Sequence, residues 1–182
     1  MSNTPPSEVR RRAEVWLRGP LPGIPALLQP VAHSLLQCRE ELNAAIPALS
    51  SDQIWETPSG AASVGFHVRH AAGSLDRLFT YARGERLSAD QRAAFAAEAQ
   101  PDLAPNSGAR LLAAFSETVD RALQQLERTP ESSLLEFRGV GRAQLPSTVL
   151  GLLFHAAEHT QRHAGQVATT VRIVADPVRR IP

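Results

Sequence analysis

Apolar side chains recur at intervals of three and four positions in four separate stretches of the chain, the spacing that gives an α-helix one buried face. The stretches cover residues 31–49, 64–82, 112–126 and 146–176. Four amphipathic helices predict an all-α fold in which their apolar faces meet, a four-helix bundle. Facing helices of such bundles can hold a metal ion, which directs attention to the polar residues on these faces.

The connections between the helices differ in length. The second is long, running over residues 85–108, and its polar, alanine-rich part at 88–99 predicts a short surface helix. Residues 131–145 contain two glycines and predict a loop or a short hairpin. Ser147 and Thr148 precede the fourth helix, where their hydroxyl groups can accept from the first backbone N–H groups.

The length and composition favour one bundle domain with short additions at its ends. The chain has 182 residues, of which 43% are hydrophobic and 20% are charged, which is sufficient for one well-packed core. We expect an N-terminal arm over residues 1–23, a single four-helix-bundle domain over 24–176 and a C-terminal tail over 177–182. The arm mixes charges with prolines and glycines, which predicts a loosely held segment with a short helix around 7–17.

The net charge and the absence of lysine exclude some classes of function. The formal net charge is +1, from 19 basic and 18 acidic residues, so we expect neither a nucleic-acid partner nor a membrane-surface partner. All of the basic residues are arginines, and without lysine the chain has neither Schiff-base chemistry nor a phosphate-loop lysine.

Cysteine content and the N-terminal region exclude further classes. Cys38 is the sole cysteine of the sequence, so an internal disulfide and a thiolate zinc cluster are excluded. It lies on the apolar stripe of the first helix, which is typical of a packing role. Residues 1–18 lack the apolar core of a signal peptide, and four prolines interrupt the uncharged segment 19–38. We therefore expect a cytoplasmic protein without a membrane helix.

Five of the six histidines fall on two of the predicted helices, His67 and His70 on the second and His155, His159 and His163 on the fourth. The four-residue spacing places the last three on one face, and His159 and His163 continue the apolar stripe. A buried imidazole with an unsatisfied nitrogen costs about 1–3 kcal/mol, and a shared divalent ion removes this cost. The pattern predicts a metal site with a third ligand from the second helix, and spacing alone does not choose between His67 and His70.

Two other interpretations use the same segment. In the first, the histidines are core residues that hydrogen-bond to polar neighbours such as Gln166. In the second, His155, Glu158 and His159 form the H-x-x-E-H pattern of inverted zinc proteases, with Glu158 as general base. That pattern needs a further carboxylate ligand on a following helix, and Asp176 in the tail is the one acid that follows, so we disfavour it.

Two segments resemble a known family. The second-helix segment SVGFHVRHAAGSLDRLFTYARG and the fourth-helix segment HAAEHTQRHAGQV resemble the two signatures of the DinB-like superfamily, which includes YfiT-type metal-dependent hydrolases. The helix order, the long second connection and the Pro-Ser-Thr entry to the fourth helix also match. The resemblance covers approximately residues 26–173 and implies a four-helix bundle of the DinB/YfiT-like type.

The resemblance also implies a ligand set. It assigns a divalent metal ion, zinc or nickel, to His70, His159 and His163, which resolves the choice on the second helix. It leaves His67, His155 and Gln166 as candidates for residues that support the ligands or line the pocket.

Similar proteins include transferases and an isomerase that use a low-molecular-weight thiol. The resemblance therefore implies thiol-dependent S-transferase-like chemistry on a small-molecule substrate, with the metal holding the thiol as thiolate. One alternative is a hydrolase that uses metal-bound hydroxide, with Glu158 as the candidate base. Another is a non-catalytic, stress-related metal-binding bundle that forms a homodimer through an exposed helix face. A fourth protein ligand, His67 or His155, would indicate this structural kind of site.

Overall fold

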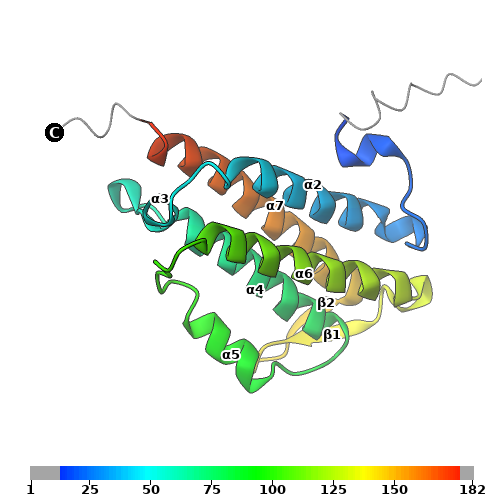
Figure 1. The fold of residues 1–182 in the computed structure, drawn as a ribbon. Helices are drawn as coiled ribbons and strands as arrows, with labels where there is room; N and C mark the ends of the chain where they lie inside the picture. Colours follow the sequence, from blue (N-terminus) through cyan, green and yellow to red (C-terminus); the bar gives the residue numbers. More distant parts are fainter. Residues whose placement is uncertain (1–12, 177–182) are drawn as a thin grey trace, which may run out of the picture.

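The computed structural model describes residues 13–176, and Figure 1 shows its helices and its small hairpin. The four long helices are α2 (Gln29–Ala45), α4 (Val64–Ala82), α6 (Ser107–Arg128) and α7 (Val149–Val174). The short helices are α3 (Ser51–Trp55) and α5 (Ala89–Ala96), and the two strands are β1 (Phe137–Val140) and β2 (Leu145–Thr148). Four short 3-10 helices lie at Val15–Arg18, Ala26–Leu28, Pro58–Gly60 and Glu131–Ser133.

The long helices form a four-helix bundle, as the hydrophobic pattern predicts. Helices α2 and α4 each pack against both α6 and α7. Each long helix contributes fully buried side chains to a shared core, among them Leu35, Leu75, Phe115 and Leu153. The all-α prediction with a long second connection is therefore confirmed. Of the two alternatives predicted for residues 131–145, the structure has the hairpin, with two antiparallel strands.

Helix α3 was not evident from the hydrophobic pattern. Its five residues begin with a capping box, in which the backbone N–H of Gln53 donates to Ser50 Oγ and that of Ser50 donates to Gln53 Oε1. The helix buries Ile54 and Trp55 against the bundle. A segment shorter than two turns has too few positions to show a helical period, so the apolar pattern could not reveal it.

The predicted starts of α6 and α7 differ from the observed starts. Helix α6 begins at Ser107, before the predicted residue 112, because Ser107 and Gly108 are buried near α3. Helix α7 begins at Val149, and Thr148 caps it by accepting from the backbone N–H of Gly151 at 3.0 Å, as predicted.

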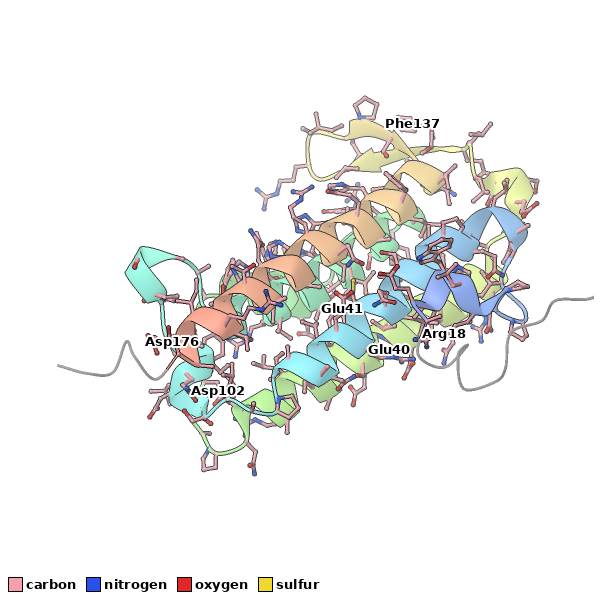
Figure 2. The ribbon with its side chains drawn as sticks, turned by 90° about the horizontal axis from the view of Figure 1, so that it is seen from above. Arg18, Glu40, Glu41, Asp102, Phe137 and Asp176 are labelled. Carbon is pink, nitrogen blue, oxygen red and sulfur yellow. The ribbon has the colours of Figure 1, made fainter. Side chains whose placement is uncertain are left out.

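Helix α5 lies outside the four-helix core, alongside α4 (Figure 1). The prediction of a short surface helix is confirmed, with Ser88 as its cap. Gln91 joins α5 to α4, since its Nε2 donates to Asp76 Oδ2 at 2.6 Å and to Thr80 Oγ1 at 2.8 Å. The hairpin lies where α7 begins, and Figure 2 shows Phe137 at the opposite end of the bundle from Asp102 and Asp176.

Part of the predicted N-terminal arm lies within the described residues. Its last turn before residue 19 packs on α2, because the backbone N–H of Val15 donates to Gln37 Oε1 at 3.0 Å and Arg18 forms a bidentate ion pair with Glu40. Residues 1–12 and the predicted tail at 177–182 lie outside the described range, as does much of the helix predicted around 7–17. None of the helices in the described range combines the length and the hydrophobicity of a membrane span.

Candidate metal centre

Three histidines from two helices converge at one point in the bundle. His70 comes from α4, and His159 and His163 come from successive turns of α7. One nitrogen from each ring can be chosen so that the three atoms lie within 4.8 Å of one another. These are the three histidines to which the family resemblance assigns a metal, and the group they form could hold a metal ion.

The distances and the donor chemistry fit a divalent ion. The Nε2 atoms of His70 and His159 lie 3.0 Å apart. A zinc ion at about 2.0–2.1 Å from two imidazole nitrogens in tetrahedral geometry separates them by about 3.3 Å. Small rotations of the rings are therefore sufficient to place both lone pairs on one ion.

A buried carboxylate sets the orientation of His70. Glu98 follows α5 and is 4% exposed, and its Oε2 lies 2.7 Å from Nδ1 of His70. A carboxylate only accepts hydrogen bonds, so it selects the tautomer with the proton on Nδ1 and leaves the Nε2 lone pair free. Arg77 donates to Glu98 Oε1 at 2.6 Å and balances the buried negative charge.

Glycine at position 73 makes room for this carboxylate. A Cβ atom on Gly73 would lie 2.4 Å from Glu98 Oε1 and 2.7 Å from Arg77 Nη1. Sequence analysis missed Glu98, because it belongs to a polar, alanine-rich connection with no spacing that relates it to the histidines. Gly73 was the available signal, since a glycine inside a helix costs about 1 kcal/mol against alanine and often marks a close approach.

His67, which also lies on α4, contacts the third histidine. The Nδ1 atoms of His67 and His163 lie 3.0 Å apart, and the two side chains are 7% and 8% exposed. If Nδ1 of His163 carries the proton and donates to His67, the Nε2 lone pair of His163 is free for an ion. In that tautomer the arrangement parallels that of His70 and Glu98, with a neutral imidazole as the acceptor.

Burial keeps these imidazoles neutral. Desolvation lowers the pKa of His67, His159 and His163 below the ordinary value, and positive charges nearby add to the effect. The pKa of His163 falls to about 4. A metal ion binds the neutral imidazole, so near neutral pH these rings present lone pairs without first losing a proton.

The protein alone does not complete the hydrogen bonds of His159. Its Nδ1 atom is buried and finds no hydrogen-bond partner among residues 13–176. Nε2 of the same ring faces His70, so an ion shared by those two rings would leave this Nδ1 atom unpaired.

The other predicted residues lie around this group. His155 is exposed, with Nδ1 3.3 Å from Glu158 Oε2, and it is not among the three converging donors. Glu158 also forms an ion pair with Arg162, which lowers the pKa of its carboxyl group. Gln166 is exposed on α7. His33, which the sequence left outside the site, is half-buried on α2 with Nε2 3.2 Å from the carbonyl oxygen of Gly19.

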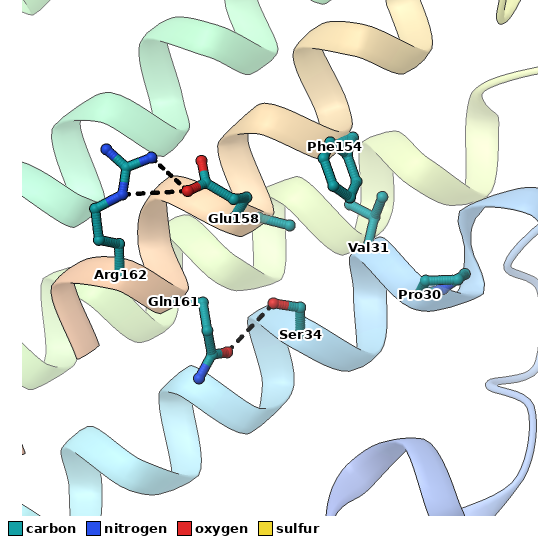
Figure 3. Close-up of a pocket in the computed structure, with 8 residues that line it drawn as sticks. Pro30, Val31, Ser34, Phe154, Glu158, Gln161 and Arg162 are labelled. Atoms are coloured by element: carbon teal, nitrogen blue, oxygen red, sulfur yellow. Dashed lines mark hydrogen bonds and ion pairs between the residues drawn. The ribbon is translucent and has the colours of Figure 1, made fainter. Parts of the chain in front are cut away.

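A cavity of about 450 Å³ lies between α2 and α7 (Figure 3). Glu158 and Arg162 border it, and Ser34 Oγ donates to Gln161 Oε1 at 3.3 Å across it. Cys38 donates to the same Gln161 oxygen at 3.1 Å and is fully buried, and burial raises the pKa of its thiol to about 12. The predicted packing role of Cys38 is thus confirmed, and the thiol is not a nucleophile near neutral pH.

The fold and the site define an α-helical bundle with a three-histidine group that could hold a metal ion. A family model described as the DinB superfamily matches residues 34–167, which include all three histidines, and the chain belongs to this superfamily. The crystal structure of a conserved protein from Enterococcus faecalis is similar, with a TM-score of 0.67 and 17% identity over 81% of this chain and 96% of that chain. This likeness shows the fold. Among curated proteins no sequence matches this chain.

Proposed function

We propose that this protein is an enzyme that binds zinc or nickel through His70, His159 and His163 and carries out thiol-dependent S-transferase-like chemistry on a small molecule. The observation that carries the proposal is the convergence of three imidazole donors from α4 and α7. Three protein donors leave a divalent ion with a free coordination position, which is typical of catalytic sites.

The charge balance of the site favours an anionic ligand. The three donors are histidines, which bind a metal without adding negative charge, and the nearby carboxylate of Glu98 is already paired with Arg77. When bound there, a divalent ion would retain its charge and lower the pKa of a coordinated thiol, which is the chemistry that S-transfer requires.

The residues around the donors hold them in position. Glu98 fixes the tautomer and ring angle of His70, and the contact with His67 holds the ring of His163. The lowered pKa of His163 keeps a proton from competing for its lone pair. These contacts act before any substrate binds, so the donor set is oriented in advance.

The hydrolase alternative has less support from the geometry. Its candidate base, Glu158, is held by Arg162 and His155, and the ion pair with Arg162 lowers the pKa of the carboxyl group. A carboxylate with a lowered pKa is a weaker base near neutral pH. The proposed thiol-dependent reaction does not use Glu158 as a base, so these contacts do not weaken it.

Elemental mass spectrometry tests the metal site. Protein without a histidine tag is compared with the double variant His70→Ala, His159→Ala and with His33→Ala, which removes a histidine outside the group. We expect about one ion per chain in the wild type and in His33→Ala, and little in the double variant, because two of three donors are lost. Equal metal content in the double variant would overturn the proposed site.

Cobalt substitution tests the thiol. Cobalt(II) is loaded into the wild type and into the double variant, and glutathione, cysteine and a matched alcohol are added in turn. We expect a thiolate-to-cobalt charge-transfer band with a thiol in the wild type alone. A cobalt protein whose spectrum ignores thiols, and which instead hydrolyses an activated ester, would replace the transferase proposal with the hydrolase.

A further inference from the structure

We propose that a second site, the arginine pocket at the hairpin end of the bundle, binds a small molecule that carries phosphate or carboxylate groups on a planar body. The arginine pocket is a cavity of about 980 Å³ between the end of α4, the start of α5 and the hairpin. Its charged and aromatic lining residues are Tyr81, Glu85, Arg86, Arg92, Phe137, Arg138 and Arg142. The volume is at the upper end of the range of about 300–1,000 Å³ found for small-molecule sites.

The arginine pocket has an excess of positive charge. Four arginines and a single carboxylate, Glu85, are found among the described residues that line it. Glu85 is already paired with Arg83 at 2.8 Å, and the ion pair lowers the pKa of its carboxyl group. Arg138 is paired with Glu136 at 2.9 Å.

The remaining three arginines are uncompensated. Within residues 13–176, Arg86, Arg92 and Arg142 form no ion pair with a carboxylate, whereas Arg18 and Arg39 on another face each have one. Guanidinium groups stay charged at all relevant pH values and form paired hydrogen bonds with phosphate and carboxylate oxygens. An anion bound among them would relieve their mutual repulsion.

The walls of the arginine pocket are joined to one another in the absence of a ligand. Arg138 links the hairpin to α4, because its Nε donates to the carbonyl oxygen of Ala82 at 2.9 Å. Gln91 links α5 to α4 through Asp76 and Thr80. A ligand would therefore meet a formed pocket, which reduces the ordering cost of binding.

A side-chain hydrogen bond also holds the turn that carries Arg142. Gly141 and Gln144 both have positive φ angles, of 67° and 49°, and Gln144 Nε2 donates to the carbonyl oxygen of Gly141 at 2.7 Å. The Gln144 side chain lies so close to Gly139 that a Cβ there would meet its Oε1 at 2.3 Å. The position of Arg142 is thus defined by the hairpin rather than by a flexible loop.

Two aromatic side chains supply the apolar part of the lining. Phe137 is 63% exposed, which is unusual for a phenylalanine unless another surface covers it, and Tyr81 lines the same cavity. Aromatic faces and guanidinium planes both stack on flat rings. The combination favours a ligand with a planar body over a simple inorganic anion.

The arginine pocket is separate from the histidine group. His70 and Tyr81 lie on the same helix and are eleven residues apart, which corresponds to about 16 Å along α4. None of the three histidines lines this pocket. Binding at the arginine pocket therefore does not require the proposed transferase activity.

Calorimetric titration of the full chain at low salt tests this inference. The probes are adenosine 5′-monophosphate, the planar dicarboxylate phthalate, and adenosine as the uncharged comparison. We expect saturable one-to-one binding of at least one anion and much weaker binding of adenosine. The ratio between the two anions distinguishes a phosphate ligand from a carboxylate ligand.

Two charge-matched double variants decide whether the pocket is responsible. Arg86→Gln, Arg142→Gln removes two uncompensated pocket arginines, and Arg39→Gln, Arg172→Gln removes two arginines elsewhere. We expect the first to weaken anion binding by about tenfold or more and the second to leave it unchanged. Anions that do not bind the wild type, or that bind both double variants equally well, would overturn the inference. His159→Ala should retain anion binding, and circular dichroism verifies that each variant is folded.

Discussion

At the scale of single residues, the contact between Glu98 and His70 is the most informative feature of the candidate centre. The carboxylate is buried, accepts from Arg77, and fixes the proton of His70 on Nδ1. Partners of this kind raise the basicity of a histidine ligand and hold its ring, and their loss typically lowers metal affinity about 10- to 100-fold. Glu98 therefore belongs to the candidate centre as much as the histidine that it orients.

Replacing Glu98 with glutamine tests this role. The amide keeps the size of the side chain but removes the charge, so we expect zinc affinity to fall about tenfold or more while the fold is retained. Competition with a chromophoric chelator measures the affinity. Glu117→Gln, at an exposed position of α6, is the control and should bind zinc as the wild type does. If Glu98→Gln bound zinc as tightly as Glu117→Gln and the wild type, Glu98 would have no role in the site.

A methyl group at position 73 should displace the same carboxylate without changing any ligand. We expect Gly73→Ala to weaken zinc binding, because its Cβ would meet Glu98 Oε1 at 2.4 Å. Gly165→Ala is the matched control, since a Cβ there has open space on α7 and should add about 0.5–1 kcal/mol of stability. Chelator competition and thermal unfolding of both variants measure the two effects. Full zinc affinity in Gly73→Ala would contradict the close approach.

The sequence could predict some residues of the centre and not others. His159 and His163 are four positions apart on an apolar stripe, so local spacing is sufficient to place them together. His70 was selected through the family resemblance, because His67 is equally close to the stripe of its helix. Glu98 reaches the site through the path of a long connection, and no local pattern encodes that path.

At the scale of elements, helix ends depend on contacts that hydrophobic periodicity does not contain. The pattern predicts α4 over 64–82 correctly, because Ser63 caps its start and Gly84 follows its end in a left-handed conformation. It misses the first residues of α6, where Gly108 faces Ile54 of α3. One undetected short helix therefore also shifted the predicted boundary of a long one.

The close packing of α3 on α4 can be tested through Gly65. A Cβ on Gly65 would lie 2.7 Å from the indole ring of Trp55, a buried group that cannot move without disturbing α3. We expect Gly65→Ala to lower the free energy of unfolding by about 1–3 kcal/mol, the usual cost of overpacking. Urea denaturation measures the change, with Gly165→Ala again as the control. A variant as stable as the wild type would show that α3 is loosely attached.

At the scale of the whole molecule, the histidines couple stability to pH. The folded pKa of His163 is about 4, and an unfolded histidine titrates near 6.5. Between these values the unfolded chain binds more protons, so stability is complete above about pH 6.5 and is lost as pH falls toward 4. His67 and His159 have lowered pKa values and contribute in the same direction.

Urea denaturation of the chelated, metal-free protein between pH 7.5 and 4.5 measures this coupling. We expect a steady loss of stability with acidification and a smaller loss in His163→Gln, which cannot take up the proton. A metal-free protein whose stability is flat across this range would contradict the burial of neutral imidazoles. Zinc should steepen the pH dependence, because protons and metal compete for the same nitrogens.

The arrangement of the whole bundle also explains what sequence analysis could not reveal about its surface. The uncompensated arginines of the arginine pocket are spread between positions 86 and 142, on three different parts of the chain. The net charge of +1 gives no sign of this local excess of positive charge, because it sums the charges of the whole chain. Four amphipathic stripes were sufficient to predict the bundle, but only the packed fold brings these residues to one end.

The buried Cys38 has a consequence for the conditions under which the protein can work. A thiol with a pKa of about 12 has a thiolate fraction near one in 10⁵ at neutral pH, and this fraction governs its exchange with disulfides. Since the sequence has no other cysteine, oxidised small thiols should leave the chain covalently unmodified. Exposure to oxidised small thiols should therefore leave the mass of the chain unchanged.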